Sequence, residues 1–180
     1  MTDQTTASAG APIGECFSWS KAWIAAHPVR FVGVILNITF RFLFGLFFFL
    51  AGLNKVLKGW MTTDILEQIF IQRLTELDPN SFANIYLTEF ALPLYPLIAW
   101  IVTLGELAVG IGLILGLATR LSSFGGFFIL FNLAIGGYYD ASLLPFFVLN
   151  IIFILYPSGH WLGLDGMLKR RYPGYGWALS

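Results

Sequence analysis

Two ionisable residues interrupt the most apolar stretches of the sequence. Arg41 lies in "NITFRFLFGLFFFLAGLNK", residues 37–55, and Glu106 lies in "LGELAVGIGLILGL", residues 104–117. A guanidinium stays ionised at neutral pH, and a carboxylate pairs with it through short, often bidentate hydrogen bonds. Charges inside membrane-spanning segments are costly and usually mark a ligand site or a proton path. We therefore take Arg41 and Glu106 as the candidate catalytic residues.

The elements that must position these two residues are membrane spans. Hydrophobic residues make up 57 % of the 180 residues and charged residues 11 %, whereas a soluble domain carries roughly 25 % charged residues. A span needs about 20 mostly apolar residues, and four stretches qualify, near 31–53, 94–117, 121–138 and 141–156. The predicted fold is all-α, a membrane four-helix bundle.

Depth within the spans predicts a direct contact. Counted from the ends of the first two spans, which run in opposite directions, Arg41 and Glu106 lie at similar depth. We expect the guanidinium and the carboxylate to lie within about 4 Å of each other, directly or through one water.

Three asparagines add hydrogen-bonding groups inside the spans. Asn37 lies one turn from Arg41, Asn132 lies in the third span and Asn150 lies in the fourth. Polar side chains inside a membrane usually face the bundle interior. Two interpretations stay open: a ligand or proton site, or a buried polar network that sets the register of the helices.

A longer polar segment, residues 54–93, separates the first two spans. Within it, "TDILEQIFIQRLTEL" places its apolar residues on one face of a helix. Ser81 or Asn80 is then positioned to cap a second short helix that runs through Phe90. The sequence thus predicts an amphipathic extramembrane helical segment, either packed on the bundle or lying on the lipid interface.

Lys and Arg residues near the spans predict the orientation. The side with both termini and the loop between the second and third spans carries six of them, and the other side carries three. We expect a multi-pass protein of the inner or plasma membrane with both termini cytoplasmic. Its parts are a polar tail, 1–28, a four-span domain, 29–157, and a cytoplasmic tail, 158–180.

Composition disfavours several function classes. The formal net charge is zero and no basic tract occurs, so we expect no nucleic-acid partner. One cysteine, Cys16, excludes an internal disulfide and a cysteine-based metal cluster. His27 and His160 lie outside the spans, so we expect no haem or metal. Redox chemistry in this bundle requires a borrowed electron carrier.

Two motifs carry a family resemblance. The first, "FRFLFGLFFFLAGLNKVLKGW", has an R-x3-G-x5-A-G-x2-K arrangement that begins at Arg41 and ends at Lys55. The second is "GELAVGIGLILGLATRLSS", which contains Glu106. Together they resemble the DoxX/DoxD family of four-span membrane proteins, and the long 54–93 segment resembles the DoxD type, the larger membrane subunit of thiosulfate:quinone oxidoreductase.

The resemblance implies thiosulfate oxidation to tetrathionate, with electrons passed to membrane quinone, and a smaller second subunit (DoxA-like). On that basis Arg41 and Asn132 would donate hydrogen bonds to the quinone, and Glu106 would deliver protons. The other expected quinone contacts are Asn37, Asn150 and the apolar wall residue Phe48. A dianionic substrate would meet Lys55, Lys58 or Arg73 at the outer face.

Two alternatives to the enzyme stay open. One is a non-enzymatic scaffold that recruits redox partners through the basic segment "KRRYPGYGW", residues 169–177. The other is a small-solute or proton carrier gated by Arg41 and Glu106. Membrane lipid is an expected partner in every case, and a homo-oligomer is compatible with each.

Overall fold

The computed structural model describes residues 17–172, and every regular element in that range is helical. Four helices correspond to the predicted spans: α2 (Pro28–Leu57), α5 (Tyr95–Leu115), α6 (Thr119–Leu133) and α7 (Leu143–Leu155). A π-helical turn, η2 (Ala134–Tyr138), continues α6. The predicted all-α membrane bundle is confirmed. Residues 1–16 of the predicted polar tail and residues 173–180 of the cytoplasmic tail lie outside the described residues.

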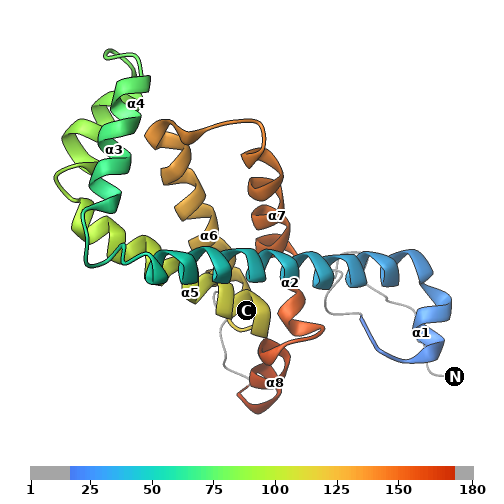
Figure 1. The fold of residues 1–180 in the computed structure, drawn as a ribbon. Coiled ribbons are helices and arrows are strands. Elements are labelled where there is room, and N and C mark those ends of the chain that lie inside the picture. Colours follow the sequence, from blue (N-terminus) through green and yellow to red (C-terminus); the bar gives the residue numbers. More distant parts are fainter. Residues whose placement is uncertain (1–16, 173–180) are drawn as a thin grey trace, which may run out of the picture.

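Three of these helices are long and apolar enough to cross a membrane, namely α2, α5 and the continuous α6–η2 segment. The fourth, α7, is equally apolar but has 13 residues, which gives it a length of about 20 Å. Pro145 falls within its first turn, where no intrahelical hydrogen bond is lost. In Figure 1, α6 and α7 lie side by side, and α2 runs across the molecule past both.

Glycines set the register of α2 against α5. A Cβ added at Gly45 would lie 2.9 Å from Leu113 Cβ, and one at Gly110 would lie 2.5 Å from the backbone nitrogen of Phe49. Gly52 meets Leu107 in the same way, at 3.0 Å from its backbone nitrogen. Small residues of this kind let two membrane helices approach to backbone contact, so these contacts determine which residues of the two helices share a level.

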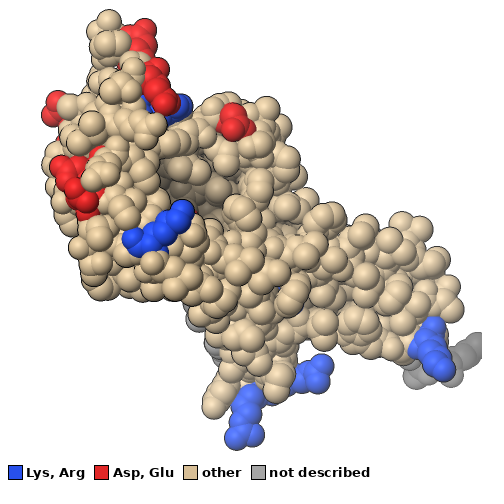
Figure 2. Space-filling model, viewed as in Figure 1, with Lys and Arg blue, Asp and Glu red and all other residues tan. Residues whose placement is uncertain are grey.

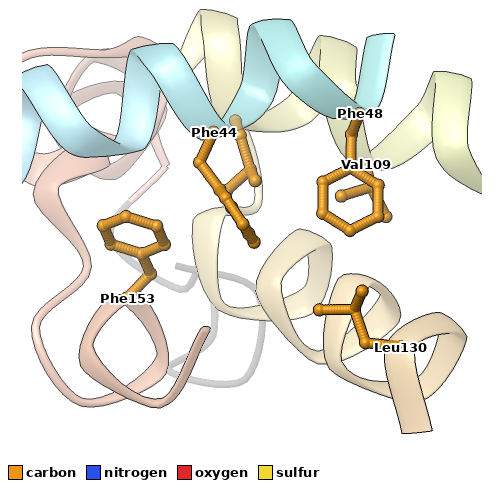
Figure 3. Packing of buried hydrophobic residues seen from close by; sticks show 6 residues of the cluster. Phe44, Phe48, Val109, Leu130 and Phe153 are labelled. Atoms are coloured by element: carbon orange, nitrogen blue, oxygen red, sulfur yellow. The ribbon is translucent and has the colours of Figure 1, made fainter. Parts of the chain in front are cut away.

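Aromatic and aliphatic side chains fill the space between the membrane helices. Phe44 and Phe48 of α2 point toward Val109 of α5, Leu130 of α6 and Phe153 of α7 (Figure 3). Phe44 and Phe48 stack edge to face, with ring centroids 5.1 Å apart, a favourable geometry for aromatic pairs. This apolar cluster holds α2, α5, α6 and α7 together.

The 54–93 segment forms a helical cap at the C-terminal end of α2. It contains α3 (Ile65–Glu76), α4 (Phe82–Tyr86) and a π-helical turn, η1 (Leu87–Ala91). Ser81 caps α4 as predicted, since its hydroxyl accepts a hydrogen bond from the Asn84 backbone at 3.2 Å. The apolar face of α3 buries Leu66 and Phe70 against the start of α5. The cap is therefore packed on the bundle, the first of the two predicted arrangements.

The opposite end of the molecule carries three short elements: α1 (Lys21–Ala26), η3 (Ser158–His160) and α8 (Leu164–Arg171). The chain after α7 folds back against α2 and the α5–α6 turn, and Asp165 is fully buried there. Figure 2 shows acidic residues gathered over the cap and basic residues over this opposite end. The predicted orientation would place this basic end in the cytoplasm.

Cysteine labelling tests the orientation. In a Cys16→Ser background, we expect a membrane-impermeant maleimide to label Asn80→Cys from outside intact cells, since Asn80 is exposed on the cap. Tyr172→Cys, exposed at the other end, serves as the control and should react only after permeabilisation. Labelling of the two positions in the reverse order would contradict the predicted topology.

Candidate functional site

The predicted contact between Arg41 and Glu106 is wrong. The Glu106 carboxylate instead accepts hydrogen bonds from the Lys55 ammonium at 2.7 and 2.6 Å. The Arg41 guanidinium donates through Nη2 to the backbone carbonyl of Leu162 at 2.7 Å. The two residues proposed as one site therefore belong to two different regions of the protein.

The register of α2 against α5 explains the correction. Gly52 meets Leu107, the neighbour of Glu106, whereas Arg41 reaches Gly116 at the far end of α5. Eleven residues from position 41 to position 52 correspond to about 17 Å along a helix. Depth counted from the ends of apolar stretches fails because α2 has 30 residues and α5 has 21, so α2 extends past α5. The spacing of Gly45 and Gly52 was the signal that could have predicted this register.

Glu106 and Lys55 lie on the wall of a cavity of about 250 Å³ beneath the cap. The cavity is enclosed by the cap above and by α2, α5 and α6–η2 below. Its walls are mostly apolar, and its polar members are Lys55, Glu106, Trp60, Tyr86, Asn132 and Tyr138. Such an apolar pocket with a few convergent polar groups is the usual form of a small-molecule site, so we take it as the candidate functional site.

The Lys55–Glu106 ion pair is mostly shielded from solvent, with 15 % and 10 % of the two side chains exposed. Lys55 lies in the last turn of α2, and its side chain reaches Glu106 of α5. Its ammonium also lies 5.0 Å from the centroid of the Trp60 ring, within range of a cation–π attraction. The cavity thus holds one group that can donate a proton and one that can accept it.

A second polar pair lies in the same cavity. The Tyr86 hydroxyl of α4 donates to Asn132 Oδ1 of α6 at 2.9 Å, and Asn132 Nδ2 donates to the Phe128 carbonyl at 2.8 Å. Burial raises the pKa of Tyr86 above its usual value, so the hydroxyl keeps its proton at neutral pH. The indole nitrogen of Trp60 is also buried, with no hydrogen-bond partner within residues 17–172.

Both π-helical turns border the cavity. Leu87 and Ala91 belong to η1, and Gly136 and Tyr138 belong to η2. A π-helical turn adds one residue to a helix and redirects the side chains beside it, and such turns are frequent at functional sites. Their position here follows that pattern.

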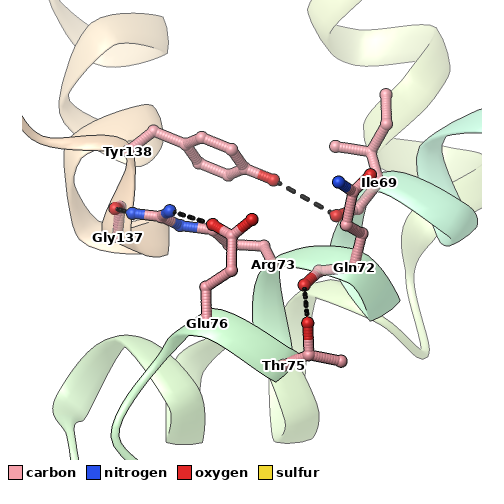
Figure 4. Close-up of polar contacts among 7 residues, drawn as sticks. All are labelled: Ile69, Gln72, Arg73, Thr75, Glu76, Gly137 and Tyr138. Atoms are coloured by element: carbon pink, nitrogen blue, oxygen red, sulfur yellow. Dashed lines mark hydrogen bonds and ion pairs between the residues drawn. The ribbon is translucent and has the colours of Figure 1, made fainter.

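Polar contacts fasten the cap over the cavity (Figure 4). The Arg73 guanidinium donates to the Glu76 carboxylate at 2.6 Å and to the Gly137 carbonyl, and it lies over the Tyr138 ring. The Tyr138 hydroxyl donates to the Ile69 carbonyl at 3.4 Å. Gly137 has φ of 83°, a conformation that favours glycine. Together these contacts tie α3 to the end of α6–η2.

The structure separates the other predicted quinone contacts. Asn132 lies in the cavity with Glu106. Asn37 lies in the N-terminal half of α2, where it donates to the Tyr156 carbonyl at 3.3 Å. Phe48 belongs to the apolar cluster of Figure 3, and Asn150 is fully buried on α7, where it donates to the Phe146 carbonyl. Neither Phe48 nor Asn150 lines the cavity.

The predicted substrate cations do not form one anion site. Lys55 is paired with Glu106 and Arg73 with Glu76, while Lys58 is exposed. Trp60, Tyr86 and Tyr138 are polar cavity residues that the sequence did not predict. Trp60 and Tyr86 are amphipathic aromatic residues in the 54–93 segment, a signal that was present but not specific.

These features define a helical membrane protein with a capped cavity at one end of its bundle. The DoxX family model matches residues 36–136, which is more than half of the 180 residues, and the chain belongs to the DoxX family. The match runs from α2 to η2 and includes every residue that lines the cavity except Tyr138. No curated protein and no solved structure matches the chain.

Proposed function

We propose that this protein is the quinone-reactive membrane subunit of an oxidoreductase, and that the quinone ring binds in the cavity beneath the cap. The observation that carries the proposal is the Lys55–Glu106 pair on the wall of a mostly apolar cavity between membrane helices and the cap. A quinone is an apolar ring with two carbonyl oxygens that must gain protons when it is reduced. The cavity offers an apolar wall for the ring and ionisable groups that can supply the protons.

Size and wall chemistry support a ring ligand. An apolar cavity of roughly 150 Å³ accepts benzene, and this one measures about 250 Å³. Phe70, Trp60 and Tyr86 supply aromatic surface to the walls. The donors available to quinone carbonyls are the Trp60 indole N–H and the Lys55 ammonium, and the Asn132 amide lies beside them.

The proton chemistry is assigned to Glu106 and Lys55. Reduction of a quinone takes up two electrons and two protons and yields the quinol. A carboxyl held beside an ammonium can pass a proton to a carbonyl oxygen and be reprotonated in turn. Arg41 has no part in this step, since it contacts Leu162 and Gly116 at the other end of α5.

The electron donor proposed for this subunit is thiosulfate, by its family resemblance. Two thiosulfate ions joined as tetrathionate release the two electrons that one quinone accepts. Lys55 and Arg73 are each engaged by a carboxylate, and acidic residues surround the cap (Figure 2). A dianion is repelled by such a surface. We therefore assign thiosulfate binding to a second subunit that associates with this membrane subunit.

The scaffold is the second candidate, because Lys169, Arg170 and Arg171 are exposed together at the end of α8. The carrier gated by Arg41 and Glu106 is not proposed further, since those two residues do not meet.

Filling the cavity tests the quinone site. An added Cβ at Gly136 would lie 3.5 Å from Leu87 and 3.7 Å from the Tyr138 ring, so a side chain fits without displacing backbone. Gly136→Leu would occupy the cavity, and we expect it to weaken binding of a short-chain ubiquinone analogue about tenfold or more, which corresponds to about 1.4 kcal/mol. Binding is measured by quenching of tryptophan fluorescence, with Trp60 as the nearest reporter.

Gly33→Leu is the matched control. An added Cβ at Gly33 has no atom within 4 Å, and Gly33 lines a separate groove between α2 and α7. This variant should bind the analogue like the wild-type protein. Equal affinity of the wild type and Gly136→Leu, with both folded, would contradict the proposed site, as would a loss confined to Gly33→Leu.

A further inference from the structure

Arg41 is a buried cation whose hydrogen-bonding capacity is only partly used. It is 3 % exposed, and Nη2 donates to the Leu162 carbonyl at 2.7 Å. Nε and Nη1 are buried and have no hydrogen-bond partner within residues 17–172. Buried donors without acceptors are rare in proteins and indicate a missing water, ion or ligand. The fold thus retains a guanidinium with donors to spare near the cytoplasmic end of the bundle.

The nearest carboxylate does not use those donors. Asp165 attracts Arg41 electrostatically, but its oxygens accept hydrogen bonds from the Ala118 backbone at 2.7 Å and from the Thr119 backbone and hydroxyl at 3.0 and 2.7 Å. The Asp165 carboxylate thus caps the start of α6. Arg41 therefore keeps two donors, Nε and Nη1, for another acceptor.

A groove of about 770 Å³ lies beside Arg41, between α2 and the 160–170 segment. Arg41 and Arg170 both line it, and its lining residues include no Asp or Glu. The remaining wall is largely apolar and exposed, and includes Phe42, Leu43, Leu115, Leu162 and Met167. The groove therefore combines a cationic pole with a surface that suits hydrocarbon.

The groove lies at the end of the bundle that carries the excess of Lys and Arg, the end expected to face the cytoplasm. Basic pockets between membrane helices on this side characteristically bind the headgroups of anionic phospholipids. Exposed apolar side chains next to the cations provide the contact surface that the acyl chains of such a lipid require.

We infer that this groove is a binding site for an anionic phospholipid of the cytoplasmic leaflet. The phosphate pairs with the Arg170 guanidinium, and Arg41 attracts it from behind, through its spare donors or a bridging water. The acyl chains lie along Phe42, Leu43 and Leu115. A free phosphate ion would use the cations but none of this apolar wall, and a zwitterionic lipid would use the wall but gain less from two arginines.

The test uses full-length protein purified in a mild detergent. Phosphatidylglycerol, phosphatidylcholine or inorganic phosphate is titrated in, and binding is followed by native mass spectrometry and by the thermal midpoint. We expect phosphatidylglycerol to bind most tightly. One arginine near an anionic lipid surface contributes a factor of about five to affinity, so Arg170→Gln should weaken phosphatidylglycerol binding about fivefold while Arg170→Lys largely retains it.

Arg171→Gln is the matched control, since Arg171 is exposed on the same helix, carries the same charge and does not line the groove. It should bind phosphatidylglycerol like the wild type. An equal loss of phosphatidylglycerol affinity in Arg170→Gln and Arg171→Gln would show that only the net charge matters, and it would overturn the assignment. Equal affinity for phosphatidylcholine, or an equal response to inorganic phosphate, would overturn it as well. All of these variants change exposed side chains, so their folding is not at risk.

Discussion

The Glu106→Gln variant is expected to fold like the wild-type protein and to lose most of its quinone reduction. The glutamine oxygen still accepts a hydrogen bond from Lys55, which lies 2.6 Å from the carboxylate in the wild type. Lys55 loses its counter-ion, but its ammonium still lies 5.0 Å from the Trp60 ring centroid. The amide cannot carry a proton to the quinone, and removal of a general acid costs about 100-fold or more in rate.

Thermal stability and thiosulfate-dependent reduction of a quinone analogue are measured on the same preparation of each variant. Each variant is co-expressed with the proteins encoded by the neighbouring genes. Asn37→Ala is the activity control, because Asn37 does not line the cavity and donates its hydrogen bond to the Tyr156 carbonyl. It should keep its activity. Full activity in a well-folded Glu106→Gln protein would reject proton transfer by Glu106, and the Lys55–Glu106 ion pair would then be a structural contact.

The Asp165→Ala variant is expected to lose about 3 kcal/mol or more of stability, since each buried donor left without an acceptor costs about 1–3 kcal/mol. Asp165 is fully buried, and three donors from Ala118 and Thr119 point at its oxygens. Ala118 adopts φ of 47°, an uncommon conformation outside glycine, so the turn between α5 and α6 depends on this support. Arg41 would also lose the electrostatic attraction of the Asp165 carboxylate.

Reversible unfolding in mixed micelles measures this effect. Asp165→Asn keeps one acceptor oxygen and should be destabilised less than Asp165→Ala. Asp140→Ala is the control, because Asp140 is exposed and its contact is the local turn with Ser142. A loss for Asp165→Ala no greater than that of Asp140→Ala would show that the turn is held by packing alone.

The two ends of the protein therefore have separate tasks in our interpretation. The outer end holds the capped cavity with Lys55 and Glu106, and the cytoplasmic end holds Arg41, Asp165 and the lipid groove. Failure of the Gly136→Leu prediction would remove the quinone site and leave the lipid site untouched. The Arg170→Gln experiment likewise has no bearing on the cavity, because Arg170 does not line it.

Local patterns in the sequence were enough to predict the helices. A long apolar run can satisfy its backbone only as a helix in a membrane, so α2, α5 and α6–η2 fall close to the predicted spans. Ser81 caps α4 for an equally local reason, since its hydroxyl reaches a backbone nitrogen three residues ahead. The apolar face of the 65–76 helix likewise predicted an amphipathic segment, and the structure decided that this face packs on the bundle. Each of these features depends on residues within a few turns of one another.

The partners of the charged residues were decided by the tertiary structure alone. Glu106 meets Lys55 because the glycine contacts place Gly52, and not Arg41, at the level of Glu106. The eleven residues between positions 41 and 52 correspond to about 17 Å along the helix. Asp165 meets Thr119 because the chain after α7 folds back under the bundle, over a separation of 46 residues. The sequence by itself determined that Arg41 and Glu106 are buried, since apolar neighbours surround both residues. It could not determine which charges pair, because pairing depends on the depth at which two helices pack.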